Sequence, residues 1–64
     1  MSPIVKYDPE ANAAYIRLSP EKVEESEEVA PGIVLDYDAK GRIVGMEVLD
    51  ARAHLSPELL TKAA

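Results

Sequence analysis

Hydrophobic and polar residues alternate along much of this chain, which is the pattern of strands that turn one face toward a core. Residues 13–18 show it most clearly, because every second residue there is apolar: Ala14, Ile16 and Leu18. Residues 3–7 also favour a strand, since they contain isoleucine, valine and tyrosine. Between the two, residues 8–12 combine an aspartate, a proline and an asparagine, so they predict the turn of a hairpin.

A second hairpin is predicted around residues 38–41, which read Asp-Ala-Lys-Gly. Asp38 favours the start of a type I turn, and Gly41 can take the left-handed conformation of a three-residue loop. The flanking segments 33–38 and 42–50 then pair as antiparallel strands. With Gly41 in the bulge, the predicted partners are Asp38 with Arg42, Tyr37 with Ile43, Asp36 with Val44, Leu35 with Gly45 and Val34 with Met46.

This predicted register leaves both faces of the second hairpin mostly apolar. One face holds Ile33, Leu35, Tyr37, Ile43, Gly45, Glu47 and Leu49. The other face holds Val34, Asp36, Val44, Met46 and Val48. An antiparallel sheet that meets water on one side shows polar residues there, so both faces of this hairpin are expected to be covered.

The C-terminal segment 56–63 is predicted to form one short helix. Ser56 is a favourable N-cap, and Pro57 suits the first helical position. Leu55 can contact Leu60 as a hydrophobic staple. Two turns of helix can cover only one face of a small sheet. We therefore expect the other face to meet a second copy of the chain, with a dimer favoured, or a different protein, through Val34, Val44, Met46 and Val48.

The charge of the chain is concentrated in one segment. The 64 residues include 12 acidic and 7 basic side chains, for a formal net charge of −5. Residues 21–28 (EKVEESEE) contain five glutamates and one lysine, so they carry −4 of that total. Such a segment is typical of a solvated edge strand or a loop. Contact with a basic partner protein is expected through four of its residues: Glu24, Glu25, Glu27 and Glu28.

The same composition argues against several classes of protein. The seven Lys and Arg residues are scattered, so no nucleic-acid-binding surface is expected. No apolar stretch is long enough for a membrane span, and the N-terminus lacks the basic and apolar pattern of a leader. A cytoplasmic protein without a membrane partner is therefore expected.

Candidate chemistry is sparse in this sequence. The glutamates of residues 21–28 could hold a divalent cation, which keeps a metal-dependent hydrolase as the alternative, although the spacing of an EF-hand loop is absent. His54 is the only histidine, no cysteine is present, and no serine lies in a Gly-x-Ser-x-Gly motif. Asp36 and Asp38 are predicted on the face opposite Glu47, so they do not form a pair with it. No catalytic, metal-binding or cofactor-binding residue is assigned.

Three segments resemble the YuzE-like family of small bacterial and archaeal proteins: residues 7–18 (YDPEANAAYIRL), 32–38 (GIVLDYD) and 41–51 (GRIVGMEVLDA). The chain departs from the family pattern at Asn12, where an aspartate is commoner, and at Val48, where an isoleucine is. The resemblance implies an α+β fold of one curled antiparallel sheet with a terminal helix, and it brings no activity. Some members of that family lie beside genes for small toxin-like proteins, and an acidic domain could mask a basic, ribonuclease-like surface on such a protein through charge complementarity.

Together these observations predict a single α+β domain over residues 1–64. Its small antiparallel sheet has four to five strands in a meander, with one short C-terminal helix packed on one face. The functional hypothesis is a non-enzymatic protein-interaction module, with an adaptor or toxin-neutralising role, that acts as a homo-oligomer. The alternative is a small metal-dependent hydrolase that uses residues 21–28.

Overall fold

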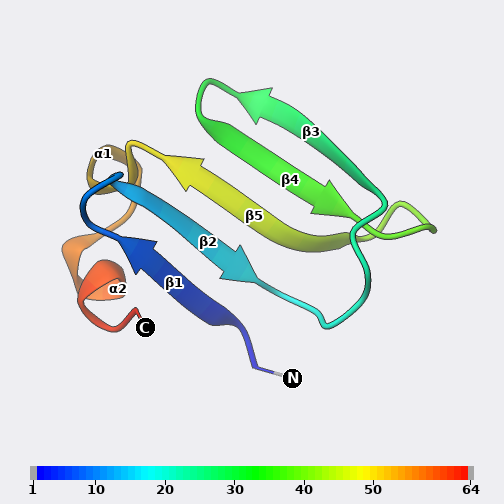
Figure 1. The fold of residues 1–64 in the computed structure, drawn as a ribbon, viewed down its shortest axis with the longest axis horizontal. Helices are drawn as coiled ribbons and strands as arrows, with labels where there is room; N and C mark the ends of the chain where they lie inside the picture. Colours follow the sequence, from blue (N-terminus) through cyan, green and yellow to red (C-terminus); the bar gives the residue numbers. More distant parts are fainter. Residues whose placement is uncertain (1, 64) are drawn as a thin grey trace.

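The computed structural model describes residues 2–63 and shows one antiparallel sheet followed by two short helices (Figure 1). The predicted α+β class is therefore confirmed. Neither helix in the described part of the chain reaches the length and apolar character that a membrane crossing requires. The strands are β1 (Ile4–Asp8), β2 (Ala13–Arg17), β3 (Glu25–Ala30), β4 (Ile33–Tyr37) and β5 (Ile43–Leu49), and the helices are α1 (Ala51–His54) and α2 (Pro57–Thr61).

The order of the strands across the sheet is β1-β2-β5-β4-β3. This order differs from the predicted meander, because the last strand, β5, lies between β2 and β4. The connection from β2 to β3 therefore runs past the ends of the central strands to the opposite edge of the sheet (Figure 1). The acidic segment 21–28 contains both structures: residues 25–28 belong to the edge strand β3, and residues 21–24 precede it outside any strand.

The register of the β4 and β5 hairpin differs from the prediction by one residue. The turn itself is as predicted: Gly41 has a φ of 78°, and its N–H donates to the Asp38 carbonyl at 3.0 Å. Tyr37 pairs with Ile43, but the next residue along, Asp36, pairs with Gly45 and not with Val44. A β-bulge at this point adds a residue to β5, and a shift of one residue moves every later side chain to the other face.

The two faces of the sheet consequently differ in polarity. Ile33, Met46 and Val48 pack on the side of the sheet that the helices cover. Strand alternation then places Val34, Asp36, Gly45 and Glu47 on the open side. The prediction that both faces of this hairpin are apolar is therefore wrong.

The corrected register also moves residues that were predicted to contact a partner. Val44 and Val48 are 1% and 0% exposed, so their side chains lie inside the chain's own core. Met46 is half-buried on the helix side, and Val34 is half-buried on the open side. The four residues thus form no continuous face.

The core lies between the sheet and the C-terminal helices. Ala14, Val48 and Ala51 form its fully buried centre, and Leu55 and Leu60 pack against them. The predicted N-cap is confirmed, because the Ser56 hydroxyl accepts from the Leu59 N–H at 3.3 Å. Helix α1 was not predicted, and both helices lie together at one end of the sheet (Figure 1).

Asp38 should make the stability of the fold depend on pH. Hydrogen bonds from the backbone N–H groups of Arg42 and Lys40, both 2.9 Å long, and the Arg42 guanidinium at 3.0 Å lower the pKa of this carboxyl below its ordinary value. A lowered pKa contributes stability above the ordinary carboxyl pKa, and that stability is lost as the pH falls through the folded-state pKa.

We therefore expect Asp38→Asn to be less stable than the wild type at neutral pH, with a difference that stays constant down to about pH 5 and narrows as the pH falls through the ordinary carboxyl pKa of about 4 and then through the lower folded-state pKa. Urea denaturation followed by circular dichroism across this range measures the difference. A difference of the same size at every pH would show that the charge of Asp38 contributes nothing.

Candidate functional site

The first candidate surface is the acidic edge strand β3. All six of its residues are exposed, and it pairs only with β4. Register places Glu27 opposite Leu35 and Glu28 opposite Val34, so neighbouring glutamates point to opposite faces of the sheet. The charge of this edge strand therefore lies on both faces of the sheet edge.

Three of the four predicted contact glutamates have local partners. Glu24 lies 3.6 Å from the Lys22 ammonium, Glu27 accepts from the Tyr37 hydroxyl at 3.2 Å, and Glu28 accepts from the Gly32 N–H at 3.2 Å. Burial and the hydrogen bond to Glu27 raise the pKa of Tyr37 above its ordinary value. Glu25 is the fourth, and it pairs across the sheet with Tyr37.

A metal site at these glutamates receives no support from their arrangement. Within residues 2–63, no three His, Asp or Glu side chains come together closely enough to hold an ion. His54 lies apart, with its Nδ1 3.1 Å from the Asp50 carbonyl and 3.2 Å from the Leu49 carbonyl. Because both carbonyls only accept, Nδ1 must carry the proton of the neutral ring.

The second candidate is a chain of polar side chains across the open face of the sheet. Ser26 donates to Asp36 Oδ1 at 2.6 Å, and the Tyr15 hydroxyl donates to Asp36 Oδ2 at 2.7 Å. Arg17 Nη1 then donates to the Tyr15 hydroxyl at 3.4 Å. The chain links β3, β4 and β2, and the Tyr15 side chain passes directly over Gly45 of β5.

This network is not arranged for acid or base catalysis. Burial and the hydrogen bond to Asp36 raise the pKa of Tyr15, while Arg17 lowers it in part. The tyrosine hydroxyl therefore keeps its proton at neutral pH, and both oxygens of Asp36 already accept a hydrogen bond. The network fixes the packing of the strands.

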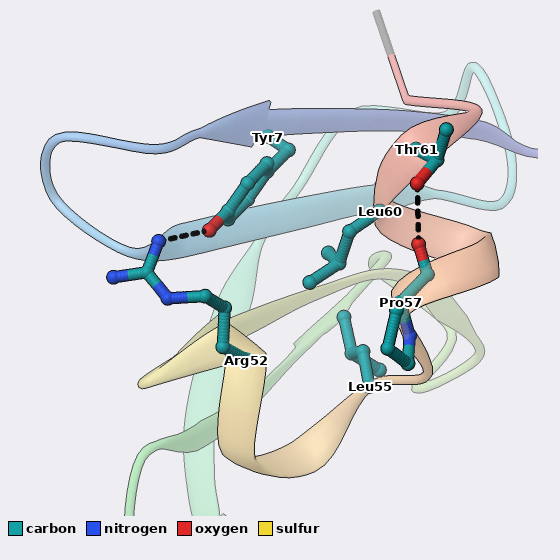
Figure 2. Close-up of a pocket in the computed structure, with 6 residues that line it drawn as sticks. All are labelled: Tyr7, Arg52, Leu55, Pro57, Leu60 and Thr61. Atoms are coloured by element: carbon teal, nitrogen blue, oxygen red, sulfur yellow. Dashed lines mark hydrogen bonds between the residues drawn. The ribbon is translucent and has the colours of Figure 1, made fainter.

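The third candidate is a hollow between β1 and the two helices, with a volume of about 430 Å³. Figure 2 shows its lining: Tyr7, Arg52, Leu55, Pro57, Leu60 and Thr61. Arg52 Nη1 donates to the Tyr7 hydroxyl at 2.8 Å, and that hydroxyl donates to Asn12 Oδ1 at 3.2 Å. Sequence reasoning missed this hollow, because Tyr7 and Arg52 are 45 residues apart and neither lies in a recognisable motif.

Asn12 holds the polar end of the hollow together. Its carbonyl accepts from the Ala51 N–H at 2.9 Å, and its Oδ1 accepts from the Arg52 N–H at 3.0 Å. Its Nδ2 donates to Asp50 Oδ1 at 3.0 Å. Asn12 therefore caps α1 from the β1–β2 turn, since Asp50 makes no side-chain cap of its own.

The sheet and its two short helices define a small α+β domain. The family described as "Protein of unknown function (DUF2283)" matches residues 4–52, which is more than half of the chain. The chain belongs to this family. Neither a curated protein nor a solved structure matches it significantly.

The matched segment contains all five strands and ends at Arg52. It therefore includes Tyr7 and Arg52 of the hollow but not the four apolar and hydroxyl residues that follow: Leu55, Pro57, Leu60 and Thr61.

Proposed function

We propose that this chain is a non-enzymatic protein-interaction module that binds a basic partner protein through the edge strand β3. The observation that supports this most directly is the position of the charge. The segment with −4 of the net −5 charge contains a strand at the edge of the sheet, and every residue of that strand is exposed. A concentrated negative surface attracts a basic partner and speeds its association.

The edge also offers backbone groups to a partner. An edge strand has one row of N–H and C=O groups without a strand beside it, and an extended segment can pair with that row. Glutamates on both faces of β3 would meet lysines or arginines that alternate in such a segment. They would also repel acidic chains, so the same residues give selectivity.

The proposal has three further parts: a biological role, a cellular location and an oligomeric state. The resemblance to the YuzE-like family supports a toxin-neutralising or adaptor role in the cytoplasm. A homodimer is also part of the proposal, although the hairpin does not have the two apolar faces expected from the sequence. Its present support is one row of half-buried apolar side chains across four strands on the helix side: Val5, Ile16, Met46 and Leu35.

Affinity purification from native lysate tests the proposed partner. We expect basic proteins to bind the tagged chain at low salt and to dissociate as salt screens the charges, because the Debye length falls to about 3 Å at 1 M. The triple variant Glu25→Gln, Glu27→Gln, Glu28→Gln should lose them.

The matched control is Glu10→Gln, Glu47→Gln, Glu58→Gln, which removes the same charge from exposed positions outside β3. Equal loss of partners from both triple variants would show that net charge alone, and not the edge, retains them. Light scattering of the free chain gives its subunit number, and a monomer would remove only the dimer from the proposal.

A further inference from the structure

The hollow between β1 and the helices has the size and lining of a small-molecule site. Its volume of about 430 Å³ is within the range of ligand pockets, roughly 300–1,000 Å³. Leu55, Leu60, Pro57 and the Tyr7 ring supply apolar surface. The Thr61 hydroxyl already donates to the Pro57 carbonyl at 2.8 Å, so the α2 side of the hollow presents little free polarity (Figure 2).

The opposite end of the hollow carries a guanidinium group with spare hydrogen-bond donors. Arg52 uses Nη1 on the Tyr7 hydroxyl, and within residues 2–63 no carboxylate lies within ion-pair distance of its side chain. The chain has 12 acidic residues, but none of the carboxylates among residues 2–63 forms an ion pair with the Arg52 side chain. The nearest acidic residue in sequence, Asp50, receives a hydrogen bond from Asn12.

The backbone around Arg52 is held by hydrogen bonds from the β1–β2 turn. Asn12 and Asp50 have φ values of 52° and 51°, in the left-handed region that asparagine and aspartate adopt more readily than other residues with a Cβ. They bond to each other, and Asn12 also bonds to the Arg52 N–H. These hydrogen bonds fix the backbone at the base of the Arg52 side chain.

We propose that this hollow binds a small amphiphilic carboxylate. The aliphatic part of the ligand lies against Leu55, Pro57 and Leu60, and its carboxylate is bound by Arg52, whose planar guanidinium suits a carboxylate better than any other side chain. The polar end lies in the segment that matches the family, and most of the apolar wall follows that segment. The proposal is independent of the acidic edge, which lies on the far strand of the sheet.

Titration of the full chain with octanoate, followed by ¹H–¹⁵N NMR, tests this site. We expect saturable shifts at Tyr7, in α1 and in α2. Octanamide, which has the same tail without the charge, and acetate, which has the charge without the tail, should each bind about tenfold or more weakly. These two comparisons use the unmodified protein, so they hold even if a variant folds poorly.

Two variants complete the experiment. Arg52→Gln should weaken octanoate about tenfold and leave octanamide unchanged. Lys40→Gln removes the same charge from the exposed β4–β5 turn and should leave octanoate binding unchanged. The proposal is overturned if octanoate does not saturate by about 10 mM, if octanamide binds equally well, or if both variants have the same effect. It is also overturned if the shifts fall outside the hollow.

Discussion

Gly45→Ala is expected to destabilise the domain by about 2 kcal/mol, although alanine is ordinarily the better residue in a strand. A Cβ at position 45 would overlap the Tyr15 hydroxyl and lie 2.8 Å from the ring carbon that bears it. The tyrosine must swing away, and its hydrogen bond to Asp36 is then broken. For a chain of this length, whose total stability is roughly 3–10 kcal/mol, such a loss is large.

A double-mutant cycle identifies Tyr15 as the cause. In a Tyr15→Ala background nothing else within 3.4 Å opposes a Cβ at position 45, so Gly45→Ala should there be neutral or stabilising. Tyr15→Phe separates the two effects, because it removes the hydrogen bond and keeps the ring. Urea denaturation gives each free energy of unfolding. An equal cost of Gly45→Ala in both backgrounds would contradict the explanation.

Val48→Ala is expected to cost about 2–3 kcal/mol, and Leu49→Ala, one residue further, less than about 1 kcal/mol. Val48 is 0% exposed and packs against Ala14 and Ala51, whereas Leu49 is 44% exposed. Leucine loses more carbon atoms than valine on truncation, so residue size alone predicts the opposite order. Burial therefore decides which substitution matters.

Thermal unfolding measures both variants directly. In a domain of 60–100 residues each kcal/mol shifts Tm by about 4–8 °C, so Val48→Ala should lower it by roughly 10–20 °C. Leu49→Ala serves as the matched control on the open face. Similar Tm values for the two variants would contradict the observed register, in which the bulge in β5 turns Val48 toward the helices.

The sequence predicted the local features of this fold better than its long-range ones. Asp38 and Gly41 gave the second hairpin its turn, and Ser56 gave α2 its start, because the physical cause lies within a few residues. The bulge lies between Ile43 and Gly45, and the prediction placed the bulge at Gly41 in the turn instead, although a glycine inside a strand can also mark one. That single extra residue changed the predicted faces, and with them the candidate contact residues.

Helix α1 and the hollow could not be predicted, because their determinants are far apart in sequence. The N–H groups that begin α1 are satisfied by Asn12, about 40 residues away. The place of β5 between β2 and β4 depends equally on contacts between distant segments. The acidic edge, by contrast, was visible from composition alone, since a run of glutamates is stable only where water reaches it.

The central position of β5 has a consequence for the order of folding. β5 is the last strand to be synthesised, yet both of its edges are paired, with β2 on one side and β4 on the other. Before it emerges, a nascent chain can form only two separate hairpins, and an isolated hairpin is marginal in water. Ribosome-bound chains that stop before residue 43 should therefore remain largely unfolded, and the domain should assemble in one cooperative step once β5 joins the two halves.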